Sequence, residues 1–343
     1  MLFGQSRRGL GWIGLCAAIG LVLLGGAAGV LAQSAPAPMS TADALPWLGR
    51  IQQAAANSSY HGTLMFSAGG VMSSSRVTHI CDGRQRYERI EVLDGRARLQ
   101  YRHNEQMLTL WPASKLARVE QREPVAEFPA LPASAVAHAL ENYELSLLAK
   151  DRIAGHEADV LMFKPHDKHR FAQRLWADRS TGLLLRNDVL GPGGEVLESS
   201  AFTDLQIGGK SSPEAVLGPM RRLEGYRVQR PQTERVQIEA EGWTLVRQVP
   251  GFTLTSCTKR PLEAATEAAA PVPVLQSVFS DGLTHVSVFI EPYDAQRHKQ
   301  PMGTSLGATH SLMNRHGDWW FTVVGEVPMA TVQQFAALFE RKR

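Results

Sequence analysis

The stretch from Glu157 to Ile207 reads EADVLMFKPHDKHRFAQRLWADRSTGLLLRNDVLGPGGEVLESSAFTDLQI and decides the fold. Four short runs rich in β-branched, aromatic and leucine residues are separated by turn-forming segments at Lys164–Asp167, Asp178–Gly182 and Gly191–Gly194. Each segment is short enough to return the next strand antiparallel beside the last, and glycine supplies the positive φ that such turns need. Leu183–Leu185 puts apolar side chains on both faces, so both faces should be partly covered. The stretch therefore predicts an antiparallel meander that packs against another element.

The preceding residues extend this sheet and supply its cover. Apolar residues recur at helical spacing from Thr41 to about Asn57, and Thr41 could accept an amide of the first turn. From Tyr60 the period becomes two. It predicts strands at 60–66, 71–80, 84–92, 99–102, 106–111, 115–121 and 143–149, with a short helix at 133–141. These patterns predict the α+β class, with a curved antiparallel sheet or incomplete β-barrel covered by helices.

A smaller α+β domain is expected after this sheet. The polar run from Gly208 to Arg222 predicts a linker. Strands are expected at 244–249, 252–256, 274–280, 285–290, 307–314 and 319–324, a mobile loop at 259–273 and a terminal helix at 328–339. The predicted organisation is a signal peptide at 1–32, a large domain at 33–209, a linker at 210–222 and a smaller domain at 223–343.

The N-terminus is typical of an exported protein. Arg7 and Arg8 precede an uncharged apolar run from Leu10 to Leu31, and Val30-Leu31-Ala32 resembles a signal-peptidase site. An uncleaved anchor is the alternative, because the run is long enough to span a bilayer. The net charge of +3 falls to +1 after cleavage, because the two arginines are lost and no acidic residue is. That charge argues against nucleic-acid binding.

Cleavage would leave two cysteines, Cys81 and Cys257. Two cysteines in an exported protein could form a disulfide. They fall in different predicted domains, each flanked by strand residues, so we favour two free, buried thiols.

Catalytic and metal-binding patterns are weak. Gly303-Thr304-Ser305-Leu306-Gly307 matches the nucleophile elbow of hydrolases, but no strand precedes it and no helix follows, so a glycine-rich hairpin is the better interpretation. His166 and His169 lie between two strands beside Pro165, which indicates a solvated turn rather than a metal site. His310 and His316 also lack further ligands. We expect no enzyme, no metal and no cofactor.

Apolar strand residues could instead line a ligand cavity, because a curved sheet often leaves an apolar opening. The candidates are Leu64, Phe66, Leu110, Trp111, Leu161, Phe163, Leu175 and Trp176. Ordinary core packing is the alternative for each of them.

Several segments in both predicted domains resemble the MucB/RseB family of sigma-E regulators. They include Leu140–Leu145, Arg152–Ala158, Arg174–Asp178, Thr181–Leu185, Leu245–Phe252, Val286–Pro292 and Val323–Pro328. The resemblance covers nearly the whole chain after the signal peptide. The loop after Arg260 and the aromatic run Trp319–Phe321 depart from it.

The resemblance implies a periplasmic regulator with a lipoprotein-carrier-like large domain. Such a protein binds the periplasmic segment of a membrane-spanning anti-sigma factor of the RseA/MucA type, shields it from the site-1 protease and releases it on a lipid or lipopolysaccharide signal. The smaller domain is expected to supply much of that contact, and a homo-oligomer is possible. The alternative is a periplasmic lipid or lipoprotein carrier without a regulatory partner.

Overall fold

The predicted meander forms one side of a twelve-stranded sheet in the computed structural model, which describes residues 37–83, 85–121, 128, 135–209, 211–262 and 272–342. The strand order is β12-β6-β5-β4-β3-β2-β1-β11-β10-β9-β8-β7, and all neighbours are antiparallel except the pair β12 and β6. The end strands β12 and β7 are not paired with each other, so the sheet is open. Its strands are β1 (Tyr60–Ala68), β2 (Val71–Asp82), β3 (Gln85–Val92), β4 (Leu99–His103), β5 (Gln106–Trp111), β6 (Leu116–Gln121), β7 (Tyr143–Ile153), β8 (His156–Pro165), β9 (Ala172–Asp178), β10 (Leu184–Leu190), β11 (Val196–Ile207) and β12 (Arg227–Gln229). This confirms the predicted α+β class with an open, curved sheet.

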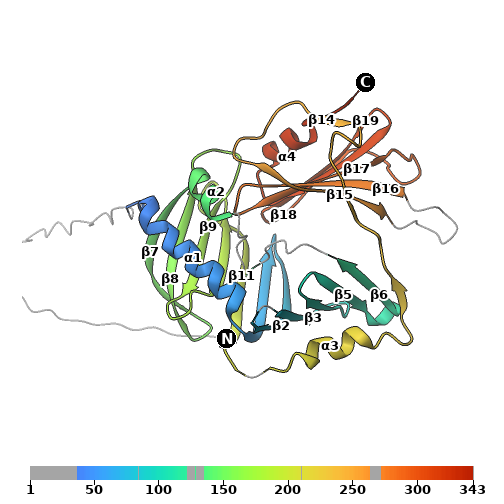
Figure 1. Cartoon of the computed structure of the whole chain (residues 1–343). Coiled ribbons are helices and arrows are strands. Elements are labelled where there is room, and N and C mark those ends of the chain that lie inside the picture. Colours follow the sequence, from blue (N-terminus) through green and yellow to red (C-terminus); the bar gives the residue numbers. More distant parts are fainter. Residues whose placement is uncertain are drawn as a thin grey trace, which may run out of the picture. The chain divides into compact units, whose positions relative to one another are not determined.

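Helix α1 (Thr41–Asn57) covers the meander side of this sheet and crosses its strands (Figure 1). Its buried residues include Leu48 and Ile51, which pack in one cluster with Leu161 and Leu175 of the sheet. The N-cap is Ser40 and not Thr41, because the Ser40 hydroxyl oxygen accepts from the Asp43 amide at 3.2 Å. Thr41 is the first helical residue.

Short helical segments adjoin the first sheet. Helix α2 (Ala135–Asn142) leads directly into β7, and a 3-10 turn η1 (Pro112–Ser114) joins β5 to β6. Helix α3 (Glu214–Arg221) lies where the sequence predicts only a connecting run. Val216 of α3 is fully buried against Tyr101 and Leu108, so this part of the expected linker packs on the sheet. The domain boundaries themselves stay a prediction.

A second, seven-stranded sheet follows in the order β13-β15-β16-β17-β20-β19-β18. Its strands are β13 (Glu234–Arg235), β15 (Thr253–Leu262), β16 (Val272–Ser280), β17 (His285–Pro292), β18 (Met302–Leu306), β19 (Thr309–His316) and β20 (Trp319–Gly325). Helix α4 (Met329–Ala336) packs on one face, where Val332 and Phe335 join the core residues Val288 and Phe321. This sheet and α4 agree with the smaller α+β unit expected from the sequence.

Three expected elements in this region differ from the structure. The strand at 244–249 is only β14 (Trp243–Leu245), because its partner β21 (Phe339–Arg341) offers three residues for pairing. The terminal helix therefore ends at Ala336 instead of 339. The strand at 307–314 begins at Thr309, because Gly307 has φ +59° and forms a turn with Ala308.

Two predictions fall outside the described residues. The signal peptide at 1–32 is one, and most of the loop expected at 259–273 is the other, although β15 reaches Leu262 and β16 begins at Val272. Among the described helices, none is long and apolar enough to cross a bilayer. Cys81 and Cys257 are free thiols, as favoured from the sequence, but Cys257 is buried and Cys81 is only half-buried.

Candidate functional site

The eight residues proposed to line a cavity are divided among several parts of the core. Leu161, Phe163 and Leu175 are fully buried in the cluster under α1. Leu64 and Trp176 belong to the adjoining cluster. Leu110 lies in the cluster that Val216 of α3 completes, and Phe66 and Trp111 are half-buried. Leu64, Phe66 and Trp111 are thus the three half-buried members of the proposed set.

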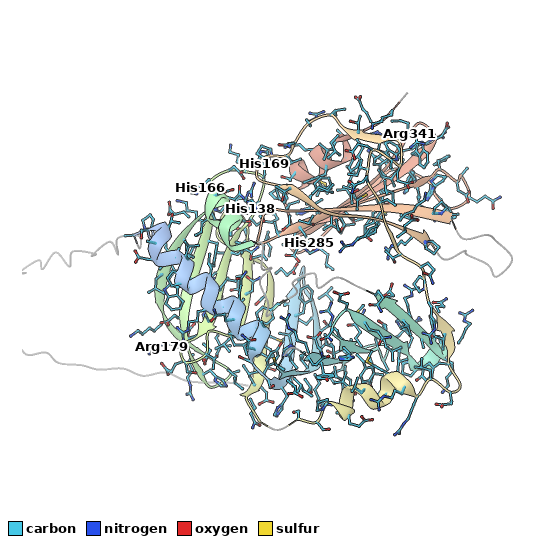
Figure 2. All side chains as sticks on the ribbon, in the orientation of Figure 1. His138, His166, His169, Arg179, His285 and Arg341 are labelled. Atoms are coloured by element: carbon cyan, nitrogen blue, oxygen red, sulfur yellow. The ribbon has the colours of Figure 1, made fainter. Side chains whose placement is uncertain are left out.

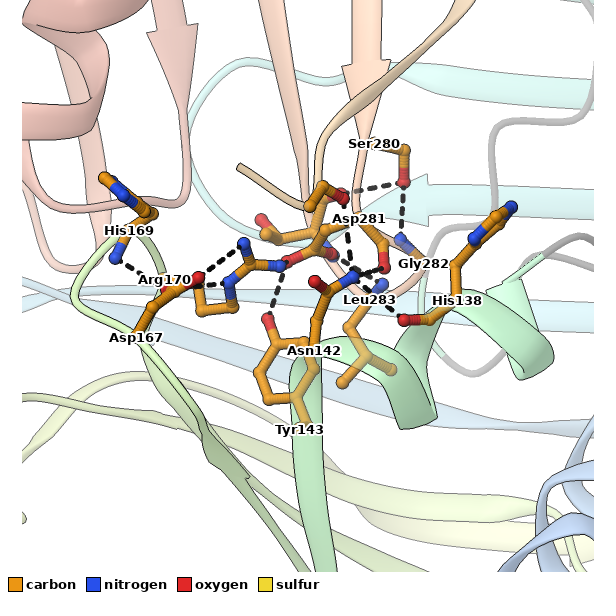
Figure 3. A network of polar contacts seen from close by, with 12 residues as sticks. His138, Asn142, Tyr143, Asp167, His169, Arg170, Ser280, Asp281, Gly282 and Leu283 are labelled. Carbon is orange, nitrogen blue, oxygen red and sulfur yellow. Dashed lines mark hydrogen bonds and ion pairs between the residues drawn. The ribbon is translucent and has the colours of Figure 1, made fainter. Parts of the chain in front are cut away.

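The turn that joins β8 to β9 carries a buried ionic contact between the two sheets (Figure 3). The Arg170 guanidinium donates to Asp281 Oδ2 at 2.8 Å, and both side chains are 0% exposed. Asp281 lies in the turn between β16 and β17. Arg170 also donates to the Pro250 carbonyl at 2.6 Å and to both carboxylate oxygens of Asp167. The Arg170 charge is thus paired with one carboxylate of its own turn, Asp167, and one from the other sheet, Asp281.

Asp281 has a full set of donors. The hydroxyl of Tyr143, the first residue of β7, donates to Oδ2 at 2.9 Å, and the amides of Leu283 and Thr284 donate to Oδ1. Burial raises the pKa of the Asp281 carboxyl, while these donors and the Arg170 charge act in the opposite direction. The pKa of Tyr143 is raised well above its usual 10.0, first by burial and then by the Asp281 charge, so this phenol remains a donor.

Backbone contacts surround the ion pair. The Asn142 side chain donates to the carbonyls of Asp281 and Gly251, and the Thr331 hydroxyl of α4 donates to the carbonyl of His169 at 3.0 Å. The guanidinium of Arg170 also lies over the ring of Phe252, 4.9 Å from its centroid. We call Asn142, Tyr143, Asp167, Arg170 and Asp281 the polar joint.

A second contact joins the same sheets at β11. Thr309 Oγ1 lies 3.5 Å from Oε2 of Glu198, and the ring of His310 stacks on that of Phe171 at 6.0 Å. Gly307 fits here because a Cβ would lie 2.6 Å from the Leu197 carbonyl oxygen. Burial, followed by the charge of Glu326, raises the pKa of Glu198 to about 7. Glu198 is therefore a buried carboxyl that titrates near neutral pH.

The predicted histidine and serine sites have other roles. His166 and His169 lie near α2 (Figure 2) in a turn bonded to both sheets, so the expected solvated turn is wrong for His169. Ser305 lies on β18, opposite His310 in a hairpin. The nucleophile elbow needs a strand-to-helix turn, and this strand-to-strand context does not provide it.

The chain matches two family models over most of its length. The MucB/RseB N-terminal domain matches residues 43–221, and the MucB/RseB C-terminal domain matches residues 237–340. This chain belongs to the MucB/RseB family. Members of this family are sigma-factor regulatory proteins that act by binding and not by catalysis.

Relatives and solved structures agree with this assignment. The chain is 31% identical over 332 residues to the sigma factor AlgU regulatory protein MucB of Pseudomonas aeruginosa, across 92% of this chain and 95% of that protein. It is 24% identical to the sigma-E factor regulatory protein RseB of Haemophilus influenzae, across 84% of this chain and 88% of that protein. The crystal structure of MucB in complex with MucA(peri) superposes with a TM-score of 0.66 at 27% identity, across 88% of this chain and all of that one. A second structure, the Pseudomonas aeruginosa MucA/MucB complex, gives the same TM-score at 28% identity.

The sequence did not single out the polar joint. Arg170 and Asp281 are 111 residues apart, and each resembles an ordinary turn residue beside strand patterns. One signal was available, because Arg170 lies two residues before β9 and Asp281 directly follows the largely apolar β16. A residue at the end of a buried strand can itself be buried, but this position does not identify its ion-pair partner.

Proposed function

We propose that this protein is a periplasmic negative regulator of a sigma-E-type envelope-stress response. It binds the periplasmic segment of a membrane-spanning anti-sigma factor and shields that segment from site-1 proteolysis. The observation that carries the proposal is the 31% identity to MucB across 92% of the chain, together with the MucB–MucA complexes among its structural neighbours. Export through the signal peptide expected at residues 1–32 supports the location.

The physics of such a partner fits reversible control. An anti-sigma segment that orders on binding loses about 2–5 kcal/mol of interaction energy to that ordering. Its net affinity is then modest, and the fraction of segment left open to the protease follows the ratio of regulator concentration to Kd. A ligand releases the segment only if it binds the segment-free form better.

A lipid or lipopolysaccharide is the releasing ligand in this proposal. Leu64, Phe66 and Trp111 are half-buried apolar residues on the first sheet and are the part of the proposed cavity that a lipid would contact first. The fully buried Leu161, Phe163 and Leu175 would take part only if α1 moved away.

Calorimetry tests the proposal. The chain from Gln33 is titrated with the periplasmic segment of the host's anti-sigma factor, with and without lipopolysaccharide. Saturable binding that weakens with lipopolysaccharide is expected. Binding that ignores lipopolysaccharide would remove the sensing part of the proposal. Lipid binding without segment binding would favour the carrier alternative.

A further inference from the structure

Strand β18 (Met302–Leu306) is an open edge of the second sheet. Among the strands that the structure describes, β18 pairs with β19 and is the last in the order. All five residues are exposed, with Met302 at 50% and Leu306 at 45%. The strand contains no charged residue and no proline. Such an edge is a ready template for another extended chain.

The other edge strands of the two large sheets are protected by charge or by pairing. β13 consists of Glu234 and Arg235, and β12 begins with Arg227. β7 carries the charged run Lys150–Arg152, and its other half is capped where the Met39 amide donates to the Leu145 carbonyl. Charges and covering segments are the usual means by which proteins prevent edge pairing. β18 has neither.

The turn at the end of β18 fixes which backbone groups point outward. Leu306 pairs with Thr309 across Gly307-Ala308, and only the first of these two turn residues has positive φ. This is a type II′ hairpin, in which the residues that flank the turn exchange hydrogen bonds. Inward bonding then alternates along the strand, so Met302, Thr304 and Leu306 bond to β19. The N–H and C=O groups of Gly303 and Ser305 point away from the sheet.

The two faces of β18 would present different surfaces to an added strand. Gly303 lies on the face of α4, where a Cβ would be 3.6 Å from Met329 Cε. Met302, Thr304 and Leu306 share the opposite face, which combines two exposed apolar side chains with one hydroxyl. An added strand could therefore place apolar side chains at alternate positions beside Met302 and Leu306.

We propose that β18 is a docking site for an extended, uncharged stretch of the partner, which adds to the second sheet as an eighth strand. The occupant is a segment of the anti-sigma factor with apolar residues at alternating positions, so this proposal rests on the function proposed above. Backbone hydrogen bonds to Gly303 and Ser305 supply affinity, and the contacts with Met302 and Leu306 select the register.

Amide hydrogen exchange of the full mature chain tests the geometry directly. The probe is the purified periplasmic segment of the host's anti-sigma factor. On saturation, exchange is expected to slow at least about tenfold at the amides of Gly303 and Ser305. The amide of Thr304 already bonds to β19 and should change much less.

Substitutions give an independent test. Ser305→Pro removes one outward donor without breaking a bond to β19, and Ser305→Ala is the matched control that keeps the donor. We expect Ser305→Pro to weaken segment binding about tenfold and Ser305→Ala to leave it within about twofold. Leu306→Lys should also weaken binding, whereas Val246→Lys, a change at another exposed apolar residue (43%), should not.

The outcomes separate the two proposals. Wild-type protein that does not bind the segment overturns both. The docking site alone is overturned if wild-type protein binds the segment but exchange at Gly303 and Ser305 does not change, and if the Ser305→Pro and Ser305→Ala variants bind the segment with equal affinity. If exchange at these amides slows as the protein concentration rises, before any segment is added, a second copy of this chain occupies the edge. That result also overturns the docking site.

Discussion

Removing one partner of the Arg170–Asp281 ion pair should destabilise the protein by more than the loss of one hydrogen bond, because the other charge stays buried. Asp281→Asn keeps the size of the side chain and an oxygen for the amides of Leu283 and Thr284, but it leaves the Arg170 charge 0% exposed with less compensation. A buried pair broken on one side costs about 3–5 kcal/mol. Asp167 still bonds to Arg170, so we expect about 3 kcal/mol for Asp281→Asn.

Arg170→Met is the complementary change. It removes the charge and leaves the Asp281 carboxylate with the Tyr143 hydroxyl and two amides, and it also vacates the Pro250 carbonyl. We expect about 3–5 kcal/mol for this variant. The double variant should cost little more than either single variant, because the second change removes a charge that the first has left unpaired. The coupling free energy should therefore exceed about 2 kcal/mol.

Urea denaturation followed by tryptophan fluorescence measures these free energies. The matched control is Glu214→Gln, which breaks the exposed pair with Arg221, whose side chains are 59% and 64% exposed. Exposed pairs contribute about 0–1 kcal/mol, so this variant should unfold almost as wild type. Single variants that lose less than 1 kcal/mol, or a double variant whose loss is the sum of the two, would refute the role assigned to the polar joint.

Three further predictions concern the titrating carboxyl, the helix that covers the meander and the helix cap. The pKa of Glu198 rises from 4.5 in the unfolded chain to about 7 in the folded protein. The folded state therefore keeps this proton to higher pH, and the free energy of unfolding should fall by at most about 3 kcal/mol between about pH 4.5 and pH 7. Urea titrations at stepped pH should show no such fall in Glu198→Gln, and a variant with the wild-type pH profile would contradict the assignment. Leu48→Ala, at a 1% exposed residue of α1, should lower the free energy of unfolding by about 2–5 kcal/mol, and a loss below 1 kcal/mol would show that α1 packs loosely. Ser40→Ala should lower the free energy of unfolding by about 1 kcal/mol and Thr41→Ala by much less. Equal losses would contradict the assignment of Ser40 as the N-cap of α1.

The sheets could be predicted from the sequence because their information is local. The turn between Asp178 and Gly182 illustrates this, since Asp178 Oδ1 accepts from the amides of Ser180 and Thr181 and Gly182 takes φ +87°. Both features depend on residues within five positions of one another. The short apolar runs that follow identify the strands of the meander. The face that α1 covers does not follow from alternation, because Leu183, Leu184 and Leu185 are all buried.

Long-range contacts decide the elements that differ from the local sequence pattern. Phe339 continues the helical stripe of α4 in sequence, yet it pairs with Leu245 and packs against Phe279, so a contact about 90 residues away decides its conformation. Met302–Leu306 gives no strand signal, because its alternation is hidden by Gly303 and Ser305, and only the pairing with β19 makes it a strand. Ion-pair partners such as Arg170 and Asp281 have no periodicity at all, so spacing could not reveal them.

The strength of the polar joint limits how a lipid could release a partner. A ligand must bind one form about 5.5 kcal/mol more tightly than the other to move an equilibrium from 1:99 to 99:1. A mechanism that separated Arg170 from Asp281 while both side chains stayed buried would add about 3–5 kcal/mol to that requirement, because each charge would lose its partner without regaining water. The contact at Glu198 is weaker, since its bond to Thr309 is 3.5 Å long and protonation of the carboxyl removes its charge. Glu198 lies on β11, beside the β1 strand that carries Leu64 and Phe66, and Thr309 begins β19, the partner of β18. A shift at this second contact could therefore couple the proposed lipid surface to the proposed docking edge while the polar joint stays intact.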